Sequence, residues 1–192
     1  MNKKYYFEVA EGDSLTVADF LAEKTPVSKM KIKLAAQNGA VWIKHQKSKK
    51  KKVRKAKTPL KVGDEVSFFY DSVLNERKAP DLAPIFINKN CSVWDKPAGL
   101  VAQGSPFGDH LAMERIVSKN VDHNNTFLIH RLDREVSGLM VFAHTRGWAA
   151  ELSKLWASSQ IIKEYQLEVI GRMPLTEGDD CLLYTSPSPR DS

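Results

Sequence analysis

The chain has 192 residues, of which 42% are hydrophobic and 27% charged, so its composition is that of a folded globular protein and excludes a disordered or fibrous one. The formal net charge of +6 at pH 7 favours a polyanionic partner. Two cysteines are too few for a disulfide framework, and no apolar run near the N-terminus is long enough to cross a membrane. We therefore expect a cytoplasmic protein with no membrane partner, made of one medium domain or two small ones.

The first predicted elements are two short helices. Asp13 or Ser14 can cap the first helix, whose apolar residues recur at helical spacing as far as Ala22. Ser28 can cap the second, which should end at Asn38-Gly39 because asparagine and glycine are typical of helix C-termini. The pattern predicts a compact helical pair before the first long strand.

Strands and a basic loop follow the helices. Val41 and Ile43 read as one strand, and Gly63-Asp64 marks a turn into another that places Val66 to Tyr70 alternately on one face. Two helices, a basic loop and a Gly-Asp-x-Val hairpin together resemble the alpha-L RNA-binding fold found in small-subunit ribosomal proteins. That resemblance predicts an RNA-binding domain over residues 12–70.

The positive charge is concentrated in this domain. Two lysines lie four residues apart on one face of the second helix, and most of the others lie in the loop after it. Such a run is also typical of a solvated or disordered loop, or of a nuclear-localisation patch. In an RNA-binding frame it would contact phosphates and supply affinity with little sequence choice. The predicted RNA-binding residues are Lys29, Lys33, Lys47, Lys49, Lys50, Lys51, Lys52, Arg54 and Lys55.

Residues 71–83 are polar and contain proline without sustained periodicity, so we expect a linker there. A second domain is predicted over residues 84–180. Its first elements are a hairpin formed by residues 85–87 and 92–94, and a sharp bend in which Pro97 and Gly99 let the backbone approach another segment closely.

The rest of the second domain alternates helices and strands. Residues 110–117 outline a helix, and residues 126–129 and 139–143 are apolar runs that read as strands on either side of a charged loop. A further helix is predicted from 149 to 156 and a last strand from 161 to 171. A loop held between two strands can fix a charged side chain beside a cleft.

Three motifs occur in order along this domain. They are K-P-A-G-L at 96–100, H-R-L-D-R-E-V-S-G-L at 130–139 and K-x-Y-x-L-x-V-x-G at 163–171. Together they resemble the motifs of the RluA-type RNA pseudouridine synthases, with valine at position 136 where that family more often has threonine. The predicted fold class is therefore α+β: a small alpha-L RNA-binding domain followed by a partial pseudouridine synthase domain with a mixed, largely antiparallel sheet.

The resemblance also assigns roles to individual residues. Asp133 would be the catalytic carboxylate, attacking the substrate or stabilising positive charge on the sugar, as glycosidase carboxylates do. Tyr165 would accept a proton, and Arg131 would fill the space left by the extruded base. A salt bridge with Glu135 is the alternative for Arg131, and a structural hydrogen bond is the expected role of His130.

Residues 181–192 are compositionally foreign, and we interpret them as a non-native tail. The resembling family continues through a late basic motif whose Arg or Lys pairs with the aspartate, so the resemblance predicts a truncated catalytic domain. No cofactor is implied, and no acidic or cysteine residues have metal-ligand spacing.

The resulting functional hypothesis is the isomerisation of uridine to pseudouridine in structured RNA by a monomeric enzyme. Ribosomal RNA is favoured over transfer RNA, and DNA is not expected. One alternative is a non-catalytic RNA-binding protein that retains the synthase fold. Another is a glycosidase or nucleosidase for small molecules, which would not depend on the lysine-rich loop.

Overall fold

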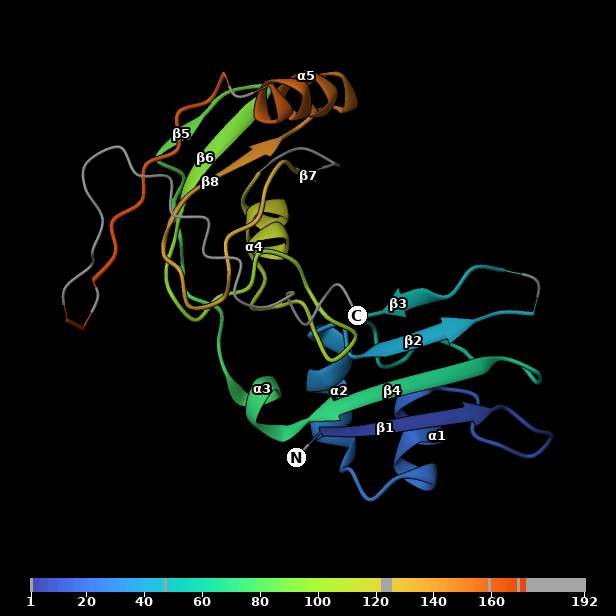
Figure 1. The fold of residues 1–192 in the computed structure, drawn as a ribbon. Helices are drawn as coiled ribbons and strands as arrows, with labels where there is room; N and C mark the ends of the chain where they lie inside the picture. Colours follow the sequence, from blue (N-terminus) through green and yellow to red (C-terminus); the bar gives the residue numbers. More distant parts are fainter. Residues whose placement is uncertain (1, 47, 122–125, 159, 169, 172–192) are drawn as a thin grey trace. The chain divides into compact units, whose positions relative to one another are not determined.

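The computed structural model describes residues 2–46, 48–121, 126–158, 160–168 and 170–171 (Figure 1). By their contacts, residues 1–160 form one compact unit and residues 161–192 a second. The first unit contains two four-stranded antiparallel sheets, each with its own buried apolar cluster. This arrangement agrees with the predicted mixture of helices and largely antiparallel strands.

The first sheet contains β1 (Asn2–Glu8), β2 (Val41–Lys44), β3 (Lys51–Val53) and β4 (Glu65–Asp71) in the order β1-β4-β2-β3. β4 runs between β1 and β2, as Figure 1 shows, and pairs with β1 along its whole length. β1 lies before residue 12, so this sheet extends beyond the range predicted for the first domain. Phe69 is also buried, because β4 is covered on both faces instead of the single face expected.

Helix α1 (Val17–Lys24) begins one turn later than its predicted caps. Thr16 is the N-cap, and its Oγ1 accepts a hydrogen bond from the backbone N–H of Asp19 at 3.3 Å. Asp13 instead pairs with Lys24 at 2.7 Å. The prediction of Asp13 or Ser14 as the cap was wrong because only Thr16 stands three residues before a first-turn N–H that it can reach.

Helix α2 (Lys29–Gln37) has the predicted limits. Ser28 is its N-cap residue, although the hydroxyl makes no capping hydrogen bond, and Asn38 is its C-cap. Gly39 follows with φ +83°, a left-handed conformation that favours glycine. The two helices pack together and bury Phe20, Leu21 and Ile32 in the first apolar cluster.

The segment predicted as a linker contains a short helix, α3 (Ser72–Glu76). Asn75 is buried there, and the Asn38 side-chain amide donates to its backbone oxygen at 3.1 Å and to its Oδ1 at 3.3 Å. Leu74 and Leu82 pack against the second apolar cluster. Residues 71–83 therefore contact the end of α2 through Asn75 and the second apolar cluster through Leu74 and Leu82.

The second sheet contains β5 (Phe86–Ile87), β6 (Cys91–Lys96), β7 (Phe127–Leu128) and β8 (Gly138–Ala143) in the order β5-β6-β8-β7. The predicted hairpin is confirmed by the antiparallel pairing of β5 with β6. The two predicted strands around the charged loop are also confirmed, because β7 and β8 pair antiparallel.

Two helices accompany the second sheet. α4 (Met113–Asn120) begins three residues after the predicted start at His110, and its Met113, Ile116 and Val117 are buried in the second cluster. α5 (Arg146–Ala157) contains the helix predicted at 149–156, but none of its residues is buried. Within the part of the chain that the structure describes, no helix has the length and apolarity needed to span a bilayer.

The strand predicted at 161–171 is not formed by residues 161–168 and 170–171, the part of it that the structure describes. The described residues of this segment have no regular secondary structure, and Tyr165 is 65% exposed. The alternation of apolar and polar residues that suggested a strand does not form one by itself, because a strand requires a neighbour for its backbone hydrogen bonds. The predicted non-native tail at 181–192 lies outside the described residues.

Candidate active site

The loop between β7 and β8 places Asp133 on the surface. β7 and β8 pair in register, with Leu128 opposite Phe142, so the chain between them forms the connection of a hairpin. A turn within this connection is closed by the Val136 N–H, which donates to the Asp133 backbone oxygen at 3.2 Å. The Asp133 side chain is exposed. The two flanking apolar runs predicted this loop between two strands, whereas the predicted cleft beside Asp133 stays a prediction.

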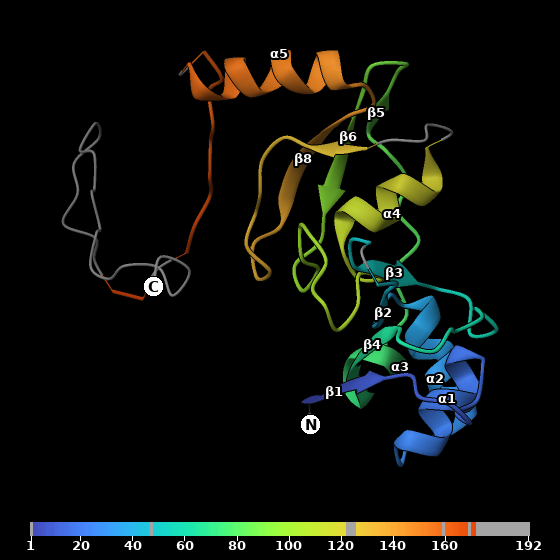
Figure 2. The same cartoon turned by 90° about the vertical axis from the view of Figure 1, so that its right-hand side faces the viewer.

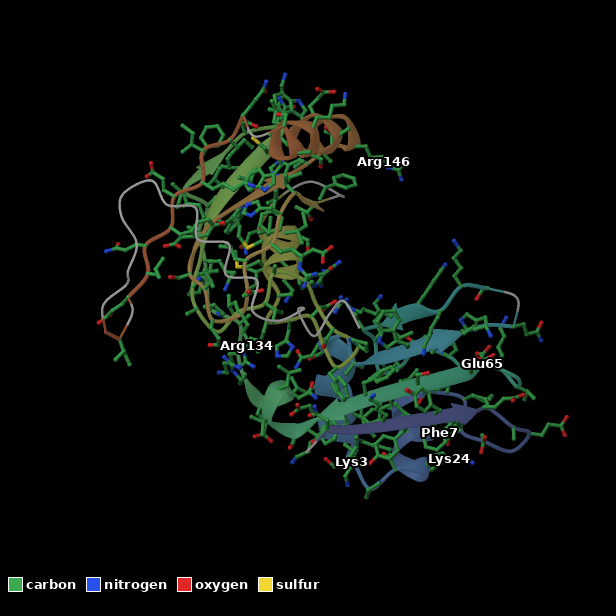
Figure 3. All side chains as sticks on the ribbon, in the orientation of Figure 1. Lys3, Phe7, Lys24, Glu65, Arg134 and Arg146 are labelled. Carbon is green, nitrogen blue, oxygen red and sulfur yellow. The ribbon has the colours of Figure 1, made fainter. Side chains whose placement is uncertain are left out.

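The K-P-A-G-L segment at 96–100 is hydrogen-bonded to this loop. Lys96 is fully buried, and its Nζ donates to the backbone oxygens of Leu100 at 2.8 Å, Pro97 at 3.1 Å and Arg134 at 3.2 Å. The Gly99 N–H donates to the same Arg134 oxygen at 2.7 Å. The neighbour of Asp133 in the chain is therefore tied to the first motif through one carbonyl group. Figure 3 labels Arg134 on this loop.

The environment of Lys96 disfavours its charge. Burial lowers the pKa of Lys96 below its ordinary value of 10.5, while the negative charges of Glu135 and Asp133 act in the opposite direction. The carboxylate of the predicted catalytic residue is thus within electrostatic range of a buried ammonium group. This link between the first two motifs was not visible as a contact in the sequence, because 37 positions separate Lys96 from Asp133.

Both ends of the loop are also anchored. His130 Nε2 accepts a hydrogen bond from the Val141 N–H at 3.1 Å, and its ring stacks on Trp156 with centroids 4.0 Å apart. Gly138 pairs with Lys96 across the sheet at φ +135°, a conformation that favours glycine. His130 therefore has the structural hydrogen bond that the sequence led us to expect.

Arg131 and Asp133 lie two residues apart on this loop, and both are exposed. Glu135 pairs with Arg134 at 3.5 Å, and no ion pair between Glu135 and Arg131 is found among the described residues. Tyr165 lies in the second compact unit and outside any helix or strand. Its role as a proton acceptor stays a prediction.

Most of the predicted RNA-binding residues are exposed, and two of them, Lys52 and Arg54, are half-buried. Lys29 pairs with Asp19 beside α1, and the Nζ of Lys50 lies 5.8 Å and 5.4 Å from the ring centroids of Tyr6 and Phe69. Lys47 is outside the described residues. The remaining exposed members are Lys33, Lys49, Lys51 and Lys55.

Lys52 and Arg54 differ from the others because they are half-buried and paired. Arg54 donates two hydrogen bonds to Asp109, at 3.0 Å from Nη1 and 2.6 Å from Nη2, and Lys52 Nζ donates to the same carboxylate at 2.7 Å. Lys52 Nζ also lies 5.0 Å from the centroid of the Trp42 ring. Sequence reasoning missed Asp109 because it lies 55 and 57 residues from its two partners.

The cation pair controls the ionisation of Asp109. Burial by itself would raise the pKa of this carboxyl, but the hydrogen bonds from Arg54 and Lys52 outweigh it and hold the pKa below 3.8. The carboxylate is therefore charged at neutral pH. Among the residues described, no group of three or more His, Cys, Asp or Glu side chains is arranged to hold a metal ion.

Comparison with known proteins identifies the segment that carries these motifs. Residues 90–182 match the family model described as RNA pseudouridylate synthase. This range includes the loop of Asp133 and the buried Lys96, so the loop geometry and the family match concern the same part of the chain. Residues 90–182 are therefore similar to the RNA pseudouridine synthases, the family that the three motifs resemble.

Individual relatives carry the same family name. The chain is 31% identical to the ribosomal large subunit pseudouridine synthase D of Yersinia pestis over 64% of this chain and 40% of that protein. It is 28% identical to an uncharacterized RNA pseudouridine synthase of Mycoplasma genitalium over 60% of this chain and 42% of that protein. A Helicobacter pylori relative, also an uncharacterized RNA pseudouridine synthase, is 24% identical over 95% of this chain and 58% of its own length. The chain thus spans less than half the length of the first two.

Proposed function

We propose that this protein isomerises uridine to pseudouridine in structured RNA, with Asp133 as the catalytic carboxylate. The observation that carries the proposal is the exposed placement of Asp133 on a hairpin loop fixed by Lys96 and Gly99, within a segment that matches the synthase family. An exposed carboxylate on a fixed loop is available to a large substrate, whereas a buried one would be available only to solvent-sized molecules.

The reaction assigns a task to each predicted residue. The glycosidic bond of uridine must break, the uracil must turn, and carbon 5 must bond to the sugar before it loses its proton. Asp133 would form a covalent adduct or stabilise positive charge on the sugar, and Tyr165 would accept the proton. Arg131, exposed two residues before Asp133, would occupy the space of the extruded base, since guanidinium groups stack well on bases.

The proposed substrate class is ribosomal RNA, held by an alpha-L RNA-binding domain over residues 12–70. The exposed Lys33, Lys49, Lys51 and Lys55 support this part of the proposal because cations of this kind bind phosphates without reading bases. The name of the Yersinia pestis relative, which refers to the large ribosomal subunit, favours ribosomal over transfer RNA. We propose a monomer acting in the cytoplasm.

The first prediction concerns Asp133→Asn. This substitution keeps the shape of the side chain but removes its nucleophilicity, so we expect isomerisation to fall by at least about a thousandfold. RNA affinity should stay the same or rise slightly, because one negative charge is lost. Isomerisation is measured as tritium released from carbon 5 of labelled uridine, and RNA affinity by fluorescence anisotropy.

Glu135→Gln is the matched control, because it removes an exposed carboxylate from the same loop and should leave isomerisation unchanged. Equal activity in the wild type and in Asp133→Asn would show that Asp133 is not the catalytic group. If the wild-type protein binds RNA without releasing tritium, the non-catalytic alternative is correct. If it shows neither activity, the whole proposal fails.

A further inference from the structure

A polar groove is lined by residues of the first sheet and of helix α4. Figure 2 shows α4 next to β3, the edge strand of that sheet. Its volume is about 480 Å³, which is enough for part of a nucleotide chain. β2 and β3 supply one wall through Trp42 and Lys52, and Arg54 follows β3. α4 supplies the other wall through Glu114, Arg115 and Ser118.

On the wall formed by the first sheet, both cations have a carboxylate partner. Asp109 lies between Lys52 and Arg54 and accepts hydrogen bonds from both. The Trp42 indole is fixed by its Nε1, which donates to the Pro106 backbone oxygen at 3.3 Å. These side chains are therefore held in place before any ligand arrives, which lowers the entropy lost on binding.

Arg115 is the cation on the facing wall, and its positive charge is not compensated. Its side chain is half-buried, and no carboxylate or other side chain pairs with its guanidinium group among the described residues. Burial, followed by the positive charge of Arg54, lowers the pKa of Arg115 from its ordinary value, while Asp109 acts in the opposite direction. The guanidinium groups of Arg54 and Arg115 thus repel each other in a groove where the Asp109 carboxylate already binds two cations.

An anion would relieve this repulsion. The ionisable side chains that line the groove are Lys52, Arg54, Arg115, Asp109 and Glu114, which together carry a net charge of +1. A phosphate oxygen suits a guanidinium group best, because the planar fork of donors can bind two oxygens at once. The exposed Lys51 precedes Lys52 in β3, so the cations predicted to bind RNA extend along the chain from the exposed loop to this groove.

We propose that this groove binds the phosphodiester backbone of the RNA substrate, with Arg115 as its main contact. The proposal rests on the proposed function, because the ligand is the RNA on which the enzyme would act. It adds a contact from α4 that the lysine-rich loop does not provide. It also gives Lys52 and Arg54 a place in RNA binding that differs from that of the loop lysines, since their charged groups face the groove and are oriented by Asp109.

The test compares Arg115→Gln with Lys119→Gln in binding to a fluorescein-labelled RNA stem-loop that has uridines in its loop. Both substitutions remove one positive charge from α4, but Lys119 is exposed and does not line the groove. We expect Arg115→Gln to weaken binding about tenfold. It should also reduce the slope of log Kd against log salt by roughly 0.7–0.9, the value for one phosphate contact. Lys119→Gln should change neither quantity by a comparable amount.

Two further measurements separate the loss of an RNA contact from a folding defect. Circular dichroism should show that Arg115→Gln folds as the wild type does, and Arg115→Lys, which keeps the charge, should restore most of the salt dependence. If Arg115→Gln binds as tightly as the wild type while Lys49→Gln and Lys51→Gln bind more weakly, the groove proposal is wrong and the proposed function stands. An equal loss in Lys119→Gln would also overturn it, because the effect would then be one of overall charge. If the wild type does not bind RNA, both proposals fail.

Discussion

Lys96 shows how one buried residue can hold the backbone of a surface loop, here the loop that carries Asp133. Its ammonium group is removed from solvent and is bonded to three backbone oxygens, one of which belongs to Arg134 beside Asp133. A buried ammonium group is costly unless hydrogen bonds replace its hydration, and these three bonds supply that replacement. The residue therefore stabilises the bend at Pro97 and the Asp133 loop together.

The second prediction concerns Lys96→Met, which retains most of the apolar volume but leaves the carbonyl groups with fewer donors. We expect the free energy of unfolding to fall by about 2–3 kcal/mol at neutral pH, because buried acceptors lose charged partners. Lys89→Met, at an exposed position before β6, is the control and should have little effect. The measurement is urea unfolding followed by tryptophan fluorescence.

The comparison of the wild type with Lys96→Met also predicts how the difference in stability depends on pH. The pKa of Lys96 is lowered in the folded state, so between that pKa and 10.5 the unfolded chain binds more protons than the folded one. The stability of the wild type relative to Lys96→Met should therefore rise as the pH is increased towards about 10.5. A relative stability that falls over this range would contradict the lowered pKa.

At the scale of an element, the loop from 103 to 110 is defined by how closely it packs. A Cβ atom placed on Gly104 would lie 2.2 Å from the Asp109 Cβ, and one placed on Gly39 would lie 2.9 Å from Asp109 Oδ1. The Asp109 N–H also donates to the Asn38 backbone oxygen at 2.9 Å. The absence of side chains at Gly39 and Gly104 thus leaves room for Asp109, and the hydrogen bond to Asn38 fixes its backbone.

The third prediction follows from this packing. Gly104→Ala should lower the free energy of unfolding by about 1–3 kcal/mol, because the added methyl group overlaps Asp109 and the loop must shift. Gly147→Ala is the matched control: its added Cβ meets no atom within 4 Å, and alanine is favoured over glycine in α5. Thermal unfolding should show a lower Tm for the first variant and an unchanged or higher Tm for the second. Equal effects in both variants would rule out the steric explanation.

At the scale of the whole molecule, Asp109 connects parts of the chain that belong to different sheets. Its loop precedes α4, which packs in the second apolar cluster, while Lys52 and Arg54 belong to or follow the first sheet. The contact between Phe69 and Phe107, with ring centroids 5.6 Å apart, lies in the same region. This set of contacts lies within the unit formed by residues 1–160.

The fourth prediction is that Asp109→Asn weakens this connection. Removing the carboxylate leaves two half-buried cations without their shared partner, so we expect a loss of about 2–3 kcal/mol in the free energy of unfolding at neutral pH. The pKa of Asp109 is lowered in the folded state, so its contribution is present above the ordinary value of 3.8 and is lost as the pH falls below it.

Urea unfolding at several pH values checks this sign. The difference between the wild type and Asp109→Asn should shrink as the pH falls below about 4, whereas the exposed Asp81→Asn control should differ little from the wild type throughout. A difference that stays constant into acid would show that Asp109 does not act through its charge.

Local patterns were sufficient for many elements of this chain. The apolar runs around the Asp133 loop, the Asn38-Gly39 helix end and the β5–β6 hairpin were all predicted from neighbouring residues, since each depends on short-range periodicity or turn chemistry. The first-helix cap and the 161–171 strand were predicted wrongly. Capping depends on which hydroxyl reaches a particular N–H, and a strand depends on a partner that periodicity does not specify.

By itself, the sequence determined that residues 90–182 resemble the RNA pseudouridine synthases, through motifs whose order and spacing are properties of the chain. Only the tertiary structure showed that Lys96 holds the backbone beside Asp133, and that Asp109 orients Lys52 and Arg54 towards a groove. The physical reason is that these contacts join residues 38 to 57 positions apart, and which such residues meet depends on how the sheets pack. Composition could reveal the positive charge, but folding decided which cations are paired and which remain available to an anion.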